Sequence, residues 1–392
     1  RKEITALQYK EFYHHVAHAA DDPWLTLHMR AEGMISYTSL LFIPSVRPFD
    51  LFEPERKLRV KLYVKRVFIT DNCEGLLPVW LRFLHGVIDS EDLDLNISRE
   101  MMQNNRVVSK IKSGITKRLV KDLTKKAEKE PETYAAFWEN FGAVLKEGVY
   151  EANTDREALL NICRFHSTFS ENLTSLEDYK KRMPEGQDTI YYIIGEELEI
   201  VKKSPHLEGF KARGVEVLLL TDPVDEFWVP AVGQFDETLF ASITQGDTDL
   251  AGIKVKETEV NADTKVEKAS EGDMALLIAL LKQALEDQIK DVRASERLTD
   301  SAVCLVADTG DLDMHLARLL KAHKQVDTVA PRILEINPAH ALIRELAAKA
   351  KEAGATDRLN DAALLLVDQA RILEGEPIPD PIAFSKRMIE VM

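Results

Sequence analysis

Apolar residues at spacings of three and four predict a long amphipathic helix over residues 98–129. Ser98 is a suitable N-cap for it, because a serine hydroxyl can accept a hydrogen bond from the first turn. The opposite side of this helix is rich in lysine and arginine, which is more typical of a solvated face than of a binding patch. The apolar side consists of Val108, Ile111, Ile115, Leu119 and Leu123, which fall on one helical face.

Other stretches carry strand patterns. Apolar and polar residues alternate over 58–65, the period of a half-buried strand. Two short apolar runs, 189–194 and 215–220, predict buried parallel strands, with a helix over 196–203 between them. That order describes a βαβ unit and a small parallel sheet. The segment 78–87 has a helical pattern.

The character of the chain changes after Phe240, because Phe384 is the only aromatic residue beyond it. Residues 245–273 are polar and acidic, which predicts a linker or a mobile loop. Beyond them the pattern predicts a further mixed domain with a helix (275–285), two strands (302–306 and 332–336) and three closing helices (339–353, 359–373 and 381–392).

These elements predict the α/β (α+β) class and several domains, as 392 residues allow. A large α/β part occupies 1–133, and a helical linker with a small α/β part occupies 134–244. The linker or mobile loop at 245–273 leads into a C-terminal domain at 274–392.

Composition excludes several classes of protein. A net charge of −15 argues against a duplex-DNA binder, which needs a basic surface. The three cysteines are too far apart for a disulfide framework or a zinc motif, which fits a reducing compartment. No signal peptide and no apolar run of about 18 residues is present, so we expect no membrane partner. We predict no metal site, and we expect the chain to be part of a longer protein because it begins at Arg1.

Several longer runs carry a family likeness. In them the chain resembles the ninety-kilodalton heat-shock-protein chaperone family, and within it the bacterial HtpG type. The runs follow the family's order and cover nearly the whole chain, more weakly after about residue 250. They lie at 41–44 (LFIP), 48–53 (PFDLFE), 61–71 (KLYVKRVFITD), 86–93 (GVIDSEDL), 98–100 (SRE), 191–193 (YYI), 219–223 (LLTDP) and 225–226 (DE).

The resemblance implies an α/β/α middle domain with a smaller βαβ subdomain, then a mixed α/β dimerisation domain ending in helices. It also implies ATP hydrolysis with Mg²⁺ in the full-length protein. The nucleotide is held by an N-terminal ATPase domain, and this chain has no nucleotide-binding motif of its own. We therefore expect no cofactor on this chain alone and no hydrolysis by it.

Catalytic roles follow from the same resemblance. Arg99 reaches the γ-phosphate of ATP, and Gln103 and Asn96 support the same loop. A cation in the first turn of a helix is unfavourable by a few tenths of a kcal/mol, which favours a role for Arg99 other than helix stability. On spacing alone, a solvated arginine is the simpler interpretation. Phe49 and Phe68 match positions that support the loop; for both, a place in the core is an equal alternative.

A second candidate region lies near residue 316. Four leucines at helical spacing form an apolar stripe, which on pattern alone favours a helix facing the core. The resemblance implies instead an exposed helix that binds client proteins. Phe227 and Trp228 are further possible client contacts, with internal packing as the alternative. The stripe consists of Leu312, Leu316, Leu319 and Leu320.

The resemblance thus predicts the client-binding and dimer-forming portion of an ATP-dependent chaperone. Its partners are unfolded or partly folded clients, its own N-terminal ATPase domain, and a second copy bound through the closing helices. The C-terminal residues 388–392 contain neither a retention signal nor an acidic recruitment peptide. This favours the bacterial cytoplasm and leaves an organelle open.

Two other functions remain open on the residues alone. The chain could be the transducer portion of a related DNA-repair or topoisomerase ATPase, although its acidic charge disfavours DNA. It could also be an independent α/β enzyme, with Asp222 and Asp225 at the carboxyl ends of parallel strands.

Overall fold

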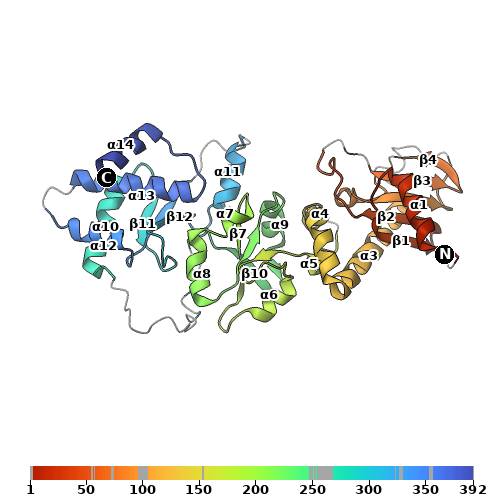
Figure 1. Ribbon diagram of the computed structural model, residues 1–392, viewed down its shortest axis with the longest axis horizontal. Helices are drawn as coiled ribbons and strands as arrows, with labels where there is room; N and C mark the ends of the chain where they lie inside the picture. The colour runs from red at the N-terminus through yellow and green to blue at the C-terminus, as the bar shows by residue number, and fades with distance from the viewer. Residues whose placement is uncertain are drawn as a thin grey trace. The chain divides into compact units, whose positions relative to one another are not determined.

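In the computed structural model the chain divides into two units, Arg1–Arg164 and Phe165–Met392 (Figure 1). The division lies beyond the boundary predicted at residue 133, because the helices that follow this boundary pack on the long helix before it. The structure describes residues 3–53, 56, 58–71, 75–95, 105–151, 154–246, 250, 253, 268–322, 324–325, 330–352 and 356–391.

The first unit is built on a five-stranded sheet with the order β1-β2-β5-β3-β4. Only the β3–β5 pair is parallel among its neighbours. Gly86 lies where β5 passes β2 with a φ of +141°, and a Cβ there would collide with the Leu40 carbonyl oxygen. The strands are β1 (Pro23–Ala31), β2 (Tyr37–Pro44), β3 (Arg59–Val64), β4 (Val67–Thr70) and β5 (His85–Ser90).

Helices complete this unit. α1 (Ala6–Ala17) packs on the sheet through Tyr13, which lies against Phe42. The remaining helices, α3 (Arg106–Lys129), α4 (Pro131–Tyr150) and α5 (Arg156–Ile162), pack on one another.

Two predictions in this unit are wrong. The segment 78–87 forms only a short 3-10 helix, η1 (Val79–Leu81), before β5, because pairing with β2 and β3 outweighs the local helical pattern. The long helix α3 begins at Arg106, not near Ser98. Its N-cap is Asn105, whose side-chain oxygen accepts from Val107 N–H at 2.8 Å.

The second unit contains the predicted parallel strands. Its first sheet has the order β6-β8-β7-β10-β9, and β7 pairs in parallel with both β8 and β10. This confirms the βαβ prediction. The strands are β6 (His166–Ser167), β7 (Thr189–Ile194), β8 (Leu218–Leu220), β9 (Gln234–Phe235) and β10 (Thr238–Ser242); the helices are α6 (Leu176–Arg182), α7 (Leu198–Val201), η2 (Pro205–Leu207), α8 (Glu208–Arg213) and α9 (Asp225–Val232).

A three-stranded sheet, β11-β13-β12, follows in the same unit. Most of residues 245–273 lie outside the described residues, so the predicted linker is not tested. The elements are β11 (Asp291–Ala294), β12 (Val303–Val306), β13 (Ile333–Ile336), α10 (Glu271–Ala284), α11 (Met314–Ala322), α12 (Ala341–Lys349), α13 (Thr356–Leu373) and α14 (Pro381–Val391).

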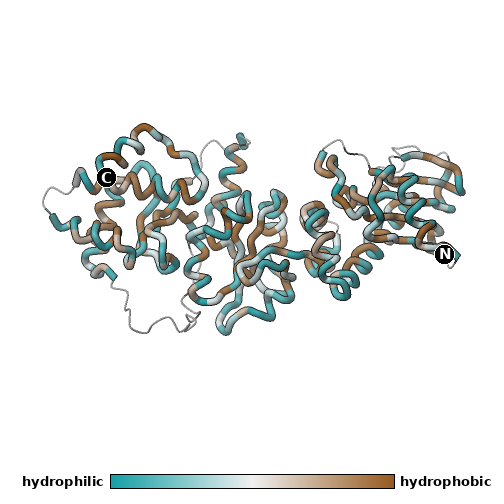
Figure 2. The backbone as a smooth tube through the Cα atoms, in the orientation of Figure 1, coloured by the Kyte–Doolittle hydropathy of each residue, from teal (hydrophilic) through white to brown (hydrophobic). Residues whose placement is uncertain are grey.

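Figure 2 shows that hydrophobic and hydrophilic residues alternate along the helices of this unit. Buried side chains of α10, α12 and α13 form one core with β11, β12 and β13. Among the described residues, no helix is both long and apolar enough to cross a membrane.

Candidate functional site

The helix α11 leaves its leucine stripe only partly buried. Its buried residues are Met314 and Ala317, one turn apart. Leu312, just before the helix, is 48% exposed, and the other three leucines of the stripe are partly exposed. The helix therefore turns Met314 and Ala317 inward, and its leucines keep part of their surface in contact with solvent.

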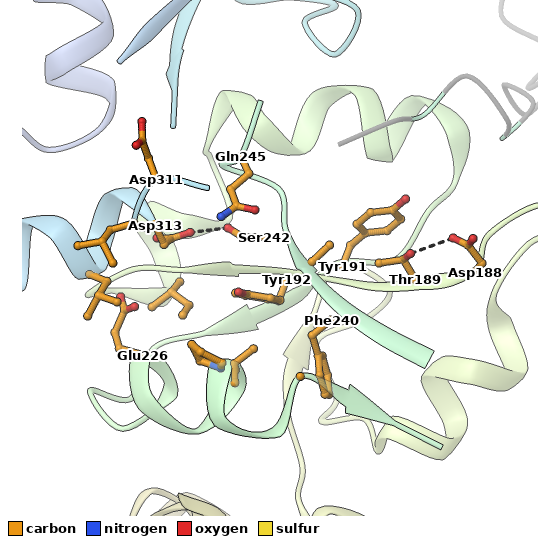
Figure 3. A pocket seen from close by; sticks show the side chains of 17 residues that line it. Asp188, Thr189, Tyr191, Tyr192, Glu226, Phe240, Ser242, Gln245, Asp311 and Asp313 are labelled. Atoms are coloured by element: carbon orange, nitrogen blue, oxygen red, sulfur yellow. Dashed lines mark hydrogen bonds between the residues drawn. The ribbon is translucent and has the colours of Figure 1, made fainter. Parts of the chain in front are cut away.

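Polar contacts fix the start of α11 against the first sheet of its unit. Asp313 Oδ1 accepts from the His315 N–H at 3.0 Å, as an N-cap residue does. The other oxygen of Asp313 accepts from Ser242 Oγ at 2.5 Å (Figure 3). It also accepts from Thr244 Oγ1 at 2.7 Å. One carboxylate thus caps the helix and ties it to the end of β10.

A second contact joins α11 to α9. Glu226 is 3% exposed, and its carboxyl group pairs with His315 Nδ1. Burial raises the pKa of Glu226, while the hydrogen bond from His315 acts in the opposite direction. A buried carboxyl group with a matched partner is stabilised, whereas one without a partner would be costly.

A cavity of about 550 Å³ opens beside these contacts. It is lined by residues of β7, β10 and α9 and by the segment that leads into α11 (Figure 3). Two leucines of the stripe, Leu312 and Leu316, belong to its wall. The cavity and the stripe are therefore parts of one continuous surface.

The two aromatic residues predicted as client contacts, Phe227 and Trp228, differ in their exposure to solvent. Phe227 is 41% exposed, so it is available for contact. Trp228 is fully buried, which contradicts its prediction as a client contact. Its indole N–H donates to Asp225 Oδ1 at 2.6 Å, and its ring lies between Phe165 and Phe240. The large apolar ring and its single donor are both satisfied inside the unit.

The contacts of Asp225 also bear on the alternative that the chain is an independent α/β enzyme, for which Asp222 and Asp225 are the candidate residues. Asp225 is fully buried; besides binding Trp228, it accepts from the Asp222 N–H at 3.0 Å. Both of its oxygens hold the turn before α9 together. Among the described residues, no group of three histidine, cysteine, aspartate or glutamate side chains could hold a metal ion.

The predicted catalytic residues Asn96, Arg99 and Gln103 lie outside the described residues. The two phenylalanines predicted to support their loop are described. Phe49 is 98% exposed, and Phe68 on β4 is about half exposed. Neither is a core residue, so the core alternative does not apply to them.

Sequence reasoning missed the polar residues around the cavity. Tyr192, Asp311 and Asp313 all line it. An aspartate at the start of an amphipathic helical pattern is an N-cap signal that could have indicated Asp313. No local signal in the sequence indicates Tyr192, which reads as one more residue of a buried strand.

The C-terminal helices also carry exposed apolar residues. On α14, Ile382, Met388 and Ile389 are all exposed, and so are Ile372 and Leu373 at the end of α13. Exposed apolar side chains on these two helices are suited to association with a partner.

Comparisons with known proteins cover the whole chain. The family model described as "Hsp90 protein" matches residues 1–392. The chain is 57% identical over 392 residues to "Chaperone protein HtpG" of Paramagnetospirillum magneticum, covering 100% of this chain and 63% of that protein. Proteins of the same name from Roseobacter denitrificans and Rhodospirillum rubrum are 54% and 52% identical, again over 100% of this chain and over 63% and 62% of their own lengths. The chain thus spans somewhat less than two thirds of these relatives.

Proposed function

Because the chain belongs to the Hsp90 protein family, we propose that it is the client-binding and dimer-forming portion of an ATP-dependent molecular chaperone. Membership of this family sets aside the DNA-repair transducer and the independent enzyme. The relatives are bacterial proteins named as chaperones, and the proposal places this chain in the bacterial cytoplasm.

The partly exposed leucine stripe of α11 carries the client-binding part of the proposal. A helix that fully buries only Met314 and Ala317 and leaves its leucines partly exposed has an apolar face for a partner. Unfolded or partly folded proteins expose apolar side chains, which gain free energy when they leave water on such a face. Phe227 adds an exposed aromatic ring in the same unit.

The closing helices carry the dimer-forming part. Ile382 and Ile389 are among the most exposed large apolar residues of the second unit. A two-fold dimer needs one surface that is complementary to itself, and helices with exposed apolar residues can supply it.

The ATP-dependent part rests on the family and on Arg99. In a closed state, this arginine reaches the γ-phosphate of ATP–Mg²⁺ held by the family's ATP-binding domain, with Gln103 and Asn96 supporting the loop. An arginine placed there stabilises the charge that develops during phosphoryl transfer. Phe49 and Phe68, both exposed, are then available to dock against that domain.

Aggregation of a thermolabile client tests the proposal. We expect the chain to suppress light scattering on heating at near-stoichiometric ratio and without nucleotide, and we expect Leu316→Asp to weaken this suppression. Ile200→Asp is the matched control, because Ile200 is an exposed apolar residue on a different helix of the same unit. Equal loss with both variants, or no suppression by the unchanged chain, would contradict the proposal.

A further inference from the structure

We infer that residues 242–246 form a strap that couples the sheet β11-β13-β12 to the helix α11, so that a disturbance of this sheet changes the client surface. The strap begins at the last residue of β10. The inference rests on the proposed function, because α11 carries the proposed client surface. It adds to that function a control of α11 by the part of the unit that ends in the closing helices.

The side chains of the strap bind the start of α11. Ser242 Oγ donates to Asp313 Oδ2 at 2.5 Å, a contact that Figure 3 marks with a dashed line. Thr244 Oγ1 donates to the same oxygen at 2.7 Å. The other oxygen of Asp313 caps α11 by accepting from the amide of His315. The position of the strap therefore helps to determine where the first turn of α11 is held.

The backbone of the strap is bound to the three-stranded sheet. The carbonyl oxygen of Thr244 accepts from the amide of Ala307, the residue after β12, at 3.0 Å. The amide of Gly246 donates to the Ala307 carbonyl oxygen at 2.8 Å. One of the closing helices, α13, packs on β12. The strap therefore connects α11 to the part of the unit that carries the proposed dimer surface.

Two arginine side chains bind the other carbonyl groups of the strap. Arg297 donates to the carbonyl oxygen of Ile243 and, at 2.9 Å, to that of Gln245. Arg293, on β11, donates to the carbonyl oxygen of Gly246. Together with the bond from the amide after β12, these contacts engage the carbonyl group of every strap residue after the first.

A single carboxylate on β13 holds both arginines in place. Glu335 Oε1 accepts from Arg293 Nη2 at 2.7 Å, and Glu335 Oε2 lies 3.1 Å from Arg297 Nε. Glu335 is 3% exposed and Arg297 is 5% exposed. A buried charge that loses its partner is strongly unfavourable. Removal of the Glu335 charge should therefore displace the arginines and release the strap, and with it the contact to Asp313.

Hydrogen exchange of α11 followed by mass spectrometry tests this coupling. Glu335→Gln keeps the size of the side chain and removes its charge, and we expect the amides of α11 to exchange about tenfold faster, as the loss of one hydrogen bond to a charged group allows. Arg293→Gln is a milder second variant, because this side chain is 37% exposed, and should give a smaller increase in the same helix.

Glu216→Gln is the matched control for Glu335→Gln. Glu216 is 8% exposed and binds Arg182 through both oxygens at 2.9 Å in the same unit. Its hydrogen bonds within the described part of the chain do not involve the strap. The variant thus removes an equally buried, arginine-bound charge and should leave the exchange of α11 unchanged.

A double-mutant cycle tests whether the effect passes through the strap. Asp313→Asn weakens the contact between the strap and α11 directly, so it should also speed exchange in α11. If both changes act through the strap, the variant that combines Asp313→Asn with Glu335→Gln exchanges more slowly than the product of the two single effects predicts. A full product would mean that the two sites act independently, and it would overturn the inference.

The remaining outcomes separate the inference from the proposed function. Unchanged exchange of α11 in Glu335→Gln would refute the coupling, and so would an equal increase in α10 or in Glu216→Gln, since each indicates general destabilisation. These measurements use no client, so they do not depend on the aggregation assay. Coupled exchange without any suppression of aggregation would refute the proposed function and keep the strap. Suppression of aggregation with an uncoupled α11 would do the reverse.

Discussion

The carboxylate of Glu208, at the start of α8, accepts several hydrogen bonds from the loop between β11 and β12. One oxygen accepts from the amides of Thr299 at 2.7 Å and Asp300 at 2.8 Å. The other accepts from Ser301, from its amide at 3.1 Å and from its hydroxyl at 2.5 Å. Glu208→Gln keeps the size of the side chain but turns one acceptor into an NH₂ group. Whichever way the amide is turned, that group faces at least one backbone N–H donor, and the bonds that remain lose the negative charge of their acceptor.

The magnitude follows from these bonds. A hydrogen bond to a charged group contributes about 1.5–3 kcal/mol, and partial exposure of Glu208 places the expected loss near the lower end, at about 2 kcal/mol. A loss of this size corresponds to a roughly 30-fold change in an equilibrium constant. We therefore expect the amides of Thr299, Asp300 and Ser301 to exchange with solvent about 30-fold faster in the variant.

Hydrogen exchange followed by mass spectrometry measures this directly on peptides that cover the loop. Glu199→Gln is the control, because Glu199 is exposed and its bond to Lys202 at 3.2 Å is a surface contact worth less than about 1 kcal/mol. Unchanged protection of the loop in Glu208→Gln would refute the reasoning. So would an equal loss of protection in the control.

The same carboxylate predicts a dependence on pH. Burial pushes the pKa of Glu208 up, but the hydrogen bonds from Asp300, Ser301 and Thr299 outweigh it, and the pKa lies below its ordinary value of 4.5. The stabilisation is therefore fully present above about pH 4.5 and is lost as the pH falls through the lower pKa of the folded state. The difference in loop protection between wild type and Glu208→Gln should shrink in that acid range.

Three further predictions concern other parts of the chain. Trp228→Phe removes the donor to Asp225 and should lower the free energy of unfolding by about 1–3 kcal/mol in urea titrations followed by circular dichroism, whereas Phe227→Leu should change it by less than about 0.5 kcal/mol. Ile389→Asp should weaken dimerisation at least about tenfold by sedimentation analysis, since it places a charge in the proposed interface, and an unchanged dimer would count against that interface. Arg99→Ala, in a chain that also carries the family's ATP-binding domain, should slow ATP hydrolysis about a thousandfold with little change in ATP affinity, and a loss below about tenfold would exclude the proposed role.

The sequence predicted the parts of the fold that are set by local pattern. The run over 189–194 is apolar or aromatic at every position after Thr189, and it forms the strand β7, which pairs with β10 on one side and β8 on the other. The helix α10 begins and ends within a few residues of its prediction, because its apolar period and its Ser270 cap are both local. The failure at 78–87 has the opposite cause. There, partners more than twenty residues away impose a strand.

The candidate site shows the same difference between local patterns, which the sequence predicts, and long-range contacts, which it does not. The leucine stripe is a local pattern and was found, but pattern alone does not show that Met314 and Ala317 are the most buried residues of its helix. What decides the orientation is contact with residues far away in the chain: Asp313 with Ser242 and His315 with Glu226. Tyr192 becomes a candidate only once the cavity exists, so no periodicity in the sequence could have revealed it.

These contacts explain how α11 can leave its leucines only partly buried and still form. A helix of nine residues is marginal by itself, so its stability must come from the rest of the unit. A helix of this kind usually gains that stability by burying its largest apolar side chains. Here Asp313 caps the helix and binds Ser242 of β10, while the pair between His315 and Glu226 ties its first turn to α9. Since polar contacts help to hold the helix in place, its leucines need not be fully buried, and their exposed part remains available for a partner.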